Sequence, residues 1–255
     1  MTAPGTVNPR PQGWWVKKDR LLYPGAGSDL WTPGAPFVGT VIYPGAGSDA
    51  WSGSPPIVTN NAPVIEFVDA AANSPAESLS SMPTHAAGDF LLFYTFRDGF
   101  TSAPALASEY TNIASGGESS CSSRLAYKVA ASSSESNPTW SNATIVMCQV
   151  YRNVSAIGAS ARTGGTSANV SAPGITLQDT SGKSWVAFFG GHTDTAGTFS
   201  SPAGSYPRRA SRGGGTAESG GYDTNGGVTS WAGQAIGSGY ASAGEQAVSV
   251  ELKGI

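Results

Sequence analysis

The chain has 255 residues, of which 34 are glycine, 17 are proline and only 12% are Asp, Glu, Lys or Arg, about half the usual charged share. A chain of this length holds one large all-β domain with an appendage, or at most two small domains. Its net charge of −3 gives it no positive field to draw it to phosphate backbones or anionic lipid. We therefore expect neither a nucleic acid nor a membrane surface as its partner.

The first residues show no basic segment followed by an apolar run, and no window approaches the roughly 18 apolar residues of a membrane-spanning helix. We expect neither a signal peptide nor a membrane span. The chain has two cysteines, Cys121 and Cys148, too few for a disulfide-stapled miniprotein or a four-cysteine zinc site. Their thiols would come close if the flanking strands paired as a hairpin, so a disulfide and two free thiols both stay open.

Residues 1–62 differ in character from the rest of the chain. Pro and Gly recur every few positions, and no apolar period lasts long enough to bury one face. Solvated linkers are normally poor in large aromatic residues, yet this segment contains four of the seven tryptophans, namely Trp14, Trp15, Trp31 and Trp51. The pattern predicts an extended, largely irregular arm that docks onto other chains.

A repeat lies within this arm: residues 22–31 read LYPGAGSDLW and residues 42–51 read IYPGAGSDAW. Pro-Gly favours a type II turn, and Ser-Asp can accept hydrogen bonds from nearby backbone N–H groups. Each copy would form a compact hook with a large aromatic residue at either end, well suited to an interface anchor. Two like hooks indicate two like sockets in a symmetric assembly, unless both fold back onto the chain's own sandwich. The aromatic ends of the hooks are Tyr23, Trp31, Tyr43 and Trp51.

From residue 63 onward, β-strand signals recur between clusters of Gly, Ser, Asn and Pro. Residues 90–94 and 185–189 are apolar on both faces, as in the centre of a sandwich. Residues 247–253 alternate between apolar and polar, as in a strand with one buried face. The predicted strands are 64–69, 90–96, 124–130, 143–151, 174–177, 184–190, 228–236 and 247–253.

No segment carries the apolar stripe and caps of a substantial helix, although 74–81 could form one short helical turn. The Gly-rich stretch 195–227 is predicted to form long surface loops. Eight antiparallel strands with long connections predict two packed sheets. The expected fold is all-β, a jelly-roll-like antiparallel β-sandwich over 63–255, preceded by the arm at 1–62.

Signatures of catalysis and of cofactor binding are missing from the sequence. It has no Gly-x-Ser-x-Gly elbow, no phosphate loop and no dinucleotide fingerprint. His192 and Asp194 could supply two metal ligands, but a metal site needs a third and a fourth. Residues 223–227 faintly resemble a calcium loop and fit a tight turn better, since the distal Glu is missing. We expect no enzyme activity, no cofactor and no metal.

Three further sets of residues are candidates for a ligand site or a catalytic site. Arg208, Arg209 and Arg212 form a local positive patch that could bind a carboxylate, a phosphate or an acidic sugar, unless they are solvated loop charges. Nothing selects a catalytic pair among the acids Glu66, Asp69, Asp89, Glu109, Glu118 and Asp223. A sugar-stacking platform could be formed by Trp140, Trp185 and Trp231, although Trp185 lies in an apolar run and fits a core position better.

Over residues 63–255, an ordered set of short segments resembles a β-sandwich module common in tail and accessory virion proteins of tailed bacteriophages. The resemblance implies a role on the particle surface or facing a receptor, without catalysis. It supplies no catalytic residues and does not extend to the arm. The segments that carry it are 88–92 (GDFLL), 124–130 (RLAYKVA), 139–140 (TW), 151–154 (YRNV), 184–189 (SWVAFF), 231–232 (WA) and 248–252 (VSVEL).

The leading hypothesis is a non-enzymatic structural protein of a bacteriophage virion, made in the host cytoplasm. Its arm would anchor in other virion proteins and its sandwich would be displayed as a tail fibre, tail-tip adhesin or capsid decoration. We expect a homo-oligomer in a symmetric assembly, with a host-surface glycan as a candidate receptor. A free carbohydrate-binding module would instead expose tryptophans on one sheet face, and a glycan-cleaving enzyme would place two carboxylates across a cleft.

Overall fold

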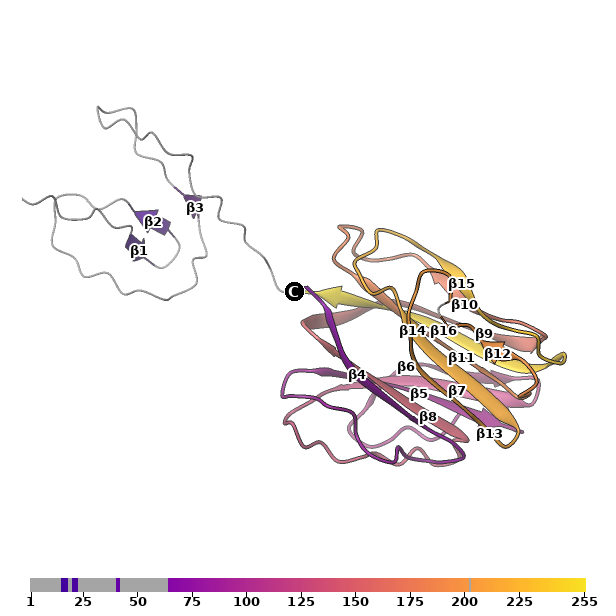
Figure 1. Ribbon diagram of the computed structural model, residues 1–255. Helices are drawn as coiled ribbons and strands as arrows, with labels where there is room; N and C mark the ends of the chain where they lie inside the picture. Colours follow the sequence, from indigo (N-terminus) through magenta and orange to yellow (C-terminus); the bar gives the residue numbers. More distant parts are fainter. Residues whose placement is uncertain (1–14, 18–19, 23–39, 42–63, 202) are drawn as a thin grey trace, which may run out of the picture. The chain divides into compact units, whose positions relative to one another are not determined.

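The computed structural model describes residues 15–17, 20–22, 40–41, 64–201 and 203–255. The chain divides into two compact units, Met1–Asn61 and Ala62–Ile255, where the composition changes. The described residues form strands, turns and loops, with no helix among them (Figure 1). The predicted all-β class is therefore confirmed for the described part of the chain.

In the first unit the structure describes three short strands. β1 (Trp15–Lys17) pairs antiparallel with β2 (Arg20–Leu22), and β3 (Thr40–Val41) pairs parallel with β2. Trp15 is described through its backbone alone. The other predicted anchors lie outside the described residues, namely Trp14, Tyr23, Trp31, Tyr43 and Trp51. Their docking stays a prediction.

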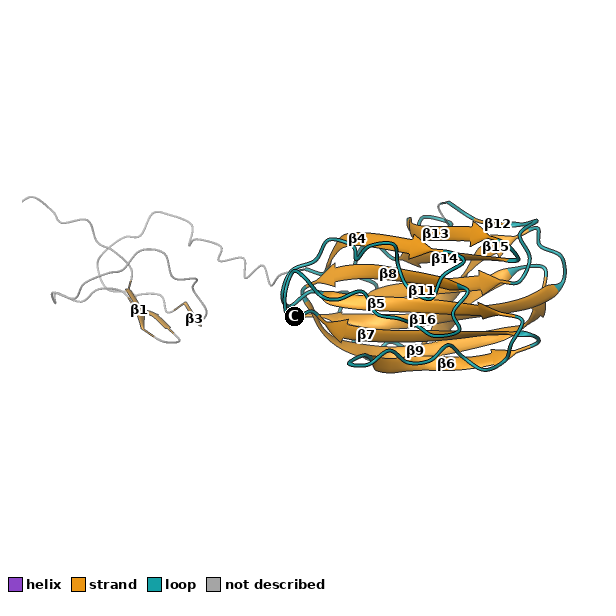
Figure 2. Cartoon of the chain, turned by 90° about the horizontal axis from the view of Figure 1, so that it is seen from below, coloured by secondary structure: helices purple, strands orange, loops and turns teal. Residues whose placement is uncertain are grey.

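Two five-stranded antiparallel sheets form the sandwich of the second unit; the first uses consecutive strands, and the strands of the second are interspersed along the chain with those of a third sheet. The first sheet has the order β4-β8-β5-β7-β6, and the second β13-β14-β11-β16-β9. A three-stranded sheet of order β10-β15-β12 accompanies the second. Figure 2 shows the long strands running side by side. The first sheet comprises β4 (Glu66–Asn73), β5 (Phe90–Asp98), β6 (Thr111–Glu118), β7 (Cys121–Val129) and β8 (Ile145–Arg152). The second comprises β9 (Val154–Ser167), β11 (Trp185–His192), β13 (Arg208–Gly214), β14 (Ala217–Asp223) and β16 (Ala243–Gly254), and the third β10 (Val170–Ile175), β12 (Thr198–Phe199) and β15 (Trp231–Ser238).

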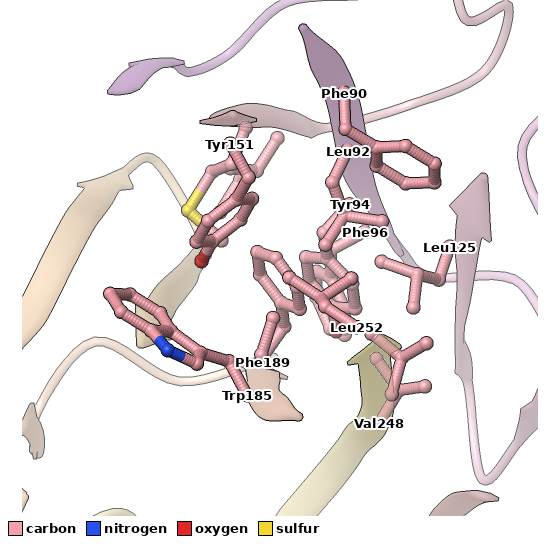
Figure 3. Close-up of a cluster of buried hydrophobic side chains, with 14 of the residues drawn as sticks. Phe90, Leu92, Tyr94, Phe96, Leu125, Tyr151, Trp185, Phe189, Val248 and Leu252 are labelled. Atoms are coloured by element: carbon pink, nitrogen blue, oxygen red, sulfur yellow. The ribbon is translucent and has the colours of Figure 1, made fainter. Parts of the chain in front are cut away.

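The main hydrophobic core lies between the two five-stranded sheets. Alternate residues of β5 face it, because successive side chains of a strand point to opposite faces. Figure 3 shows Tyr94 and Phe96 together with Phe189 of β11 in this core. The rings of Tyr94 and Phe189 stack across the two sheets with their centroids 5.3 Å apart.

The outer face of each central sheet is also buried. On the first sheet, Phe93 packs beneath Trp140 and Tyr110 from the covering loops, with ring centroids 5.3 and 5.2 Å away. On the second sheet, Phe188 packs against Trp231 of the three-stranded sheet at 4.7 Å. The prediction that 90–94 and 185–189 are central strand segments is confirmed by this two-sided burial.

The expectation of a single buried face for 247–253 is wrong. Ser249 and Glu251 of β16 are fully buried, although alternation assigned them to solvent. The hydroxyl of Ser249 donates to the carbonyl of Pro173 on β10 at 2.7 Å and accepts from the indole of Trp231 at 3.2 Å. The third sheet therefore covers the face that the sequence pattern left open.

All eight predicted strands overlap strands of the structure, but two local predictions were wrong. Residues 74–81 form bends and no helical turn. The stretch 195–227, predicted to be loops, contains β12, β13 and β14. β14 was not predicted because its glycines look in sequence like loop residues. In the structure they are strand residues that make room for aromatic rings. A Cβ on Gly220 would lie 2.9 Å from the ring of Phe199, and one on Gly221 would lie 2.9 Å from the ring of Phe189.

The two cysteines are buried free thiols. β5 lies between β7 and β8, the strands that carry Cys121 and Cys148. Cys121 belongs to the core between the sheets and Cys148 to the outer cluster of the first sheet. Their strands do not form a hairpin and their side chains face opposite sides, which decides the question against a disulfide.

Gly191 gives a direct test of the packing between the two sheets. A Cβ there would lie 2.3 Å from the ring of Phe96 on the opposite sheet, so Gly191→Ala should lower the free energy of unfolding by about 1–3 kcal/mol through overpacking. Gly165→Ala is the matched control, because its new Cβ would meet nothing closer than 3.9 Å. Urea denaturation curves should separate the two variants, and equal midpoints would contradict the packing described.

Candidate functional site

The three arginines predicted as a ligand patch lie on β13, and two of them bind groups of the chain itself. Arg209 holds Asp223 through two parallel hydrogen bonds of 2.8 and 3.0 Å, and its guanidinium lies 4.1 Å from the ring centroid of Phe67. Arg208 donates to the carbonyl of Phe199 at 2.5 Å. Arg212 is exposed. The guanidinium of Arg209 serves to neutralise a buried carboxylate.

Asp223 is fully buried between the sheets. Besides Arg209, it accepts a hydrogen bond from the backbone N–H of Asn225 at 2.9 Å and lies 3.1 Å from the hydroxyl of Tyr151. Both carboxylate oxygens are thus occupied by donors from the protein. The segment 223–227 is a turn closed by its own aspartate, which fits the tight-turn interpretation better than a calcium loop.

His192 is buried, and both of its ring nitrogens have backbone partners. Nδ1 accepts from the N–H of Asp194 at 3.0 Å, and Nε2 lies 2.9 Å from the carbonyl of Ser167. The ring stacks on Tyr240 with a centroid distance of 4.1 Å. A metal would have to break one of these contacts, and no group of three or more potential ligands occurs among the residues that the structure describes.

The three tryptophans weighed as a sugar-stacking platform each lie in a different hydrophobic cluster. Trp140, Trp185 and Trp231 expose 0%, 8% and 6% of their surface. Trp185 belongs to the core between the sheets, Trp140 to the loop-covered face and Trp231 to the three-stranded sheet. Their roles are in packing, and no shared flat face exists for a sugar ring.

The best candidate site in the described residues is a polar cavity that is lined in part by Lys128. Lys128 follows Ala126 on β7 by two positions and so lies on the outer, loop-covered face. Its ammonium donates to Glu109 at 2.7 Å and to Glu135 at 2.6 Å. Glu109 and Lys128 line a cavity of about 320 Å³, together with Ala107, Ser108, Tyr110, Ser136, Asn137, Pro138 and Thr139.

The charges in this cavity are fixed by their mutual contacts. The hydrogen bond from Lys128, helped by the backbone N–H groups of Ala131 and Ser132, lowers the pKa of Glu135. Hydrogen bonds to Glu109 and Glu135 raise the pKa of Lys128. A glycosidase general acid needs a raised carboxyl pKa. Glu135 has the opposite shift, so the geometry suits binding better than proton transfer.

Sequence reasoning named Glu109 only as one acid among six, and it missed Lys128, Glu135 and Asn137. Lys128 lies within the strand predicted at 124–130, but nothing in that pattern indicates what lies above it. The cavity forms because two loops, one on each side of the β6–β7 hairpin, fold over the same strand. A search for acids spaced around a strand lysine could have raised Glu135 as a candidate.

A second cavity, of about 340 Å³, is more apolar and lies at the end of the sandwich where β4 begins and β16 ends. Val64, Lys183, Trp185 and Ile255 are among the residues that line it. Val64 is 77% exposed and Ile255 58% exposed. Asn153 ties the start of the domain by donating to the carbonyl of Val64 at 2.9 Å.

Comparison with protein-family models, curated proteins and solved structures finds no match to this chain. The described residues include no helix long and apolar enough to cross a membrane.

Two buried glutamates of β16, Glu245 and Glu251, have pKa values that are shifted in opposite directions. Burial, and after it the nearby Glu118 carboxylate, raises the pKa of Glu245 to about 7, and its Oε2 has no hydrogen-bond partner among the described residues. Burial also opposes ionisation of Glu251. There, three backbone N–H groups and the Ser184 hydroxyl outweigh it and lower the pKa.

The two glutamates should therefore respond to pH in opposite ways. The stabilising contribution of Glu245 is fully present below its ordinary pKa of 4.5 and is lost as the pH rises through about 7. Glu245→Gln should change stability little at acid pH and raise it by about 2–3 kcal/mol above neutrality. Denaturation curves over this pH range give the measurement.

Glu251→Gln is the matched control. It should be destabilising by more than about 2 kcal/mol at neutral pH, because an amide cannot accept all four hydrogen bonds. The loss should shrink as the pH falls through the lowered pKa of Glu251. A pH-independent effect of Glu245→Gln would contradict the assignment of a buried, protonated carboxyl group.

Proposed function

We propose that the chain is a non-enzymatic structural protein of a bacteriophage virion. Residues 1–62 anchor it to other virion proteins, and the sandwich is displayed on the particle surface as a tail fibre, tail-tip adhesin or capsid decoration. The resemblance of the segments in 63–255 to virion sandwich modules is the reason for placing the protein in a virion. The tandem hooks motivate a homo-oligomeric, symmetric assembly.

The observation that carries the proposal is the division of the chain into two compact units at Asn61 and Ala62. All described members of the three hydrophobic clusters lie between Ile65 and Leu252. The sandwich thus contains its own core, as a displayed domain requires. The sequence segment with the aromatic hooks belongs to the other unit, as an anchor requires.

The two rival functions receive less support from the geometry. A carbohydrate-binding module that stacks sugars on tryptophan would need Trp140, Trp185 or Trp231 at the surface, and all three are buried. A glycan-cleaving enzyme would need a protonated carboxyl group beside a second carboxylate in a cleft. Glu245 and Glu118 are such a pair, but they line neither of the two cavities described above. In the polar cavity, Lys128 keeps both neighbouring carboxylates in charged pairs.

Removal of residues 1–62 should separate attachment from folding. The remaining sandwich should melt cooperatively with a β-type circular dichroism spectrum, because the three described hydrophobic clusters lie within it, and it should be missing from particles made by phage that carry the truncated gene. An unfolded product would show that the first unit completes the core. Wild-type occupancy in particles would contradict anchoring by the arm.

Substitution of the hook tryptophans tests the anchor more finely. Trp31→Ala and Trp51→Ala should each weaken incorporation by about 2–4 kcal/mol if they are interface anchors. The double variant should lose far more occupancy, because one bound hook raises the effective concentration of the other. Trp31→Phe and Trp51→Phe serve as conservative controls. Immunoblots of purified particles give the readout, and wild-type occupancy of the double variant would contradict the model.

A further inference from the structure

We infer that the polar cavity at Lys128 is a binding site for a single neutral sugar unit. The inference deepens the proposed function and rests on it, because it assigns a receptor contact to the displayed sandwich. The cavity volume of about 320 Å³ is at the small end of the range for small-molecule sites. That size fits one sugar ring better than an extended oligosaccharide.

The cavity presents both donors and acceptors that the protein leaves free. An ammonium group has three donors, and Lys128 uses two of them on Glu109 and Glu135. The amide nitrogen of Asn137 donates to the carbonyl of Leu79 at 2.6 Å, which leaves its oxygen as an acceptor. Hydroxyl groups without hydrogen-bond partners among the described residues are also present, on Ser108, Ser136 and Thr139.

This set of groups suits hydroxyl groups rather than an anion. The charge of Lys128 is already matched by two carboxylates at 2.7 and 2.6 Å, so an anion would meet a net negative surface. An ammonium hydrogen beside a carboxylate oxygen offers a donor and an acceptor side by side, as adjacent hydroxyls of a sugar ring require. Each sugar hydroxyl can donate and accept at once, so it can satisfy both.

The cavity is preorganised before any ligand arrives. Glu135 is held by the backbone N–H groups of Ala131 and Ser132 at 2.6 and 3.1 Å. Tyr110, which lines the cavity, packs edge-on against Trp140 with ring centroids 5.2 Å apart. Polar groups that are already fixed lose little conformational freedom on binding, and this preserves affinity.

The strained backbone at the rim supports a binding role. Glu109 has a backbone φ of +68°, a conformation that residues other than glycine, asparagine and aspartate seldom adopt. Such strain tends to persist where function needs a particular placement. Here it places the carboxylate of Glu109 within 2.7 Å of Lys128.

The test uses the full chain and saturation-transfer NMR with separate monosaccharides as probes. Glucose, galactose, mannose and N-acetylglucosamine are the neutral probes, and N-acetylneuraminic acid is the anionic one. We expect saturation transfer to at least one neutral sugar and none to the anionic sugar. Signals from none of the neutral sugars, or from the anionic sugar alone, would overturn the inference.

Two variants tie the binding to this cavity. Thr139→Val removes an exposed hydroxyl at almost constant shape and should weaken binding about 5–10-fold, the value of one hydrogen bond. Lys128→Met should abolish it, with circular dichroism as the check on folding. Thr229→Val changes an exposed threonine outside the cavity lining and should leave binding unchanged. Equal affinity of wild type and Thr139→Val would overturn the site.

Failure of the site and failure of the proposed function are separate outcomes. The Thr139→Val chain should enter particles at wild-type occupancy, because the arm is intact. If the wild-type chain binds no sugar but enters particles normally, the sugar site is contradicted and anchoring by the arm is not. If the wild-type chain binds sugar but chains without the arm still enter particles, anchoring by the arm is contradicted and the sugar site is not.

Discussion

Two strands that are apolar on both faces impose the architecture of this domain. β5 and β11 each lie at the centre of a five-stranded sheet, and neither can leave a face in water without exposing large aromatic side chains. Their inner faces meet each other, which makes the sandwich. Their outer faces need further layers, which the 74–89, 99–110 and 131–144 loops supply on one side and the three-stranded sheet on the other. The domain has four layers because β5 and β11 each need both of their faces covered.

The candidate site is a consequence of this covering. The loops that protect Phe93 and Trp140 are long enough to carry polar residues over the edge of the hydrophobic cluster, where Lys128 emerges from β7. The same loops line the cavity with the ring of Tyr110 and the carboxylate of Glu109, and they place Glu135 against the Lys128 ammonium. A covering layer required by folding has thereby become a surface that can recognise a ligand, while the strands beneath keep that surface rigid.

The sequence predicted what apolar periodicity can encode. Residues 90–96 and 184–190 have enough Phe, Leu and Val to be recognised as central strands, and they are. β9 was not predicted because it is rich in Gly, Ser and Thr, and β14 was not predicted because of its two adjacent glycines: a glycine that makes room for a ring looks in sequence like a loop glycine. Glu251 was assigned to solvent because alternation is a local signal and the layer that buries it comes from distant segments. The polar cavity was missed for the same reason: its members lie near one another only after the loops on both sides of β7 have folded.

The two ends of the described sandwich lie beside one cavity, since Val64, Gly254 and Ile255 all line it. Asn153 holds the first end through the carbonyl of Val64, and Ser155 holds the other through the carbonyls of Lys253 and Gly254. Neighbouring, hydrogen-bonded ends make a domain tolerant of circular permutation. A short linker could join residue 255 to residue 64, and new termini could open in the exposed turn at 215–216, between β13 and β14, without cutting any strand of the core. The attachment point of the sandwich could in this way be moved to a different corner while its surface loops keep their places.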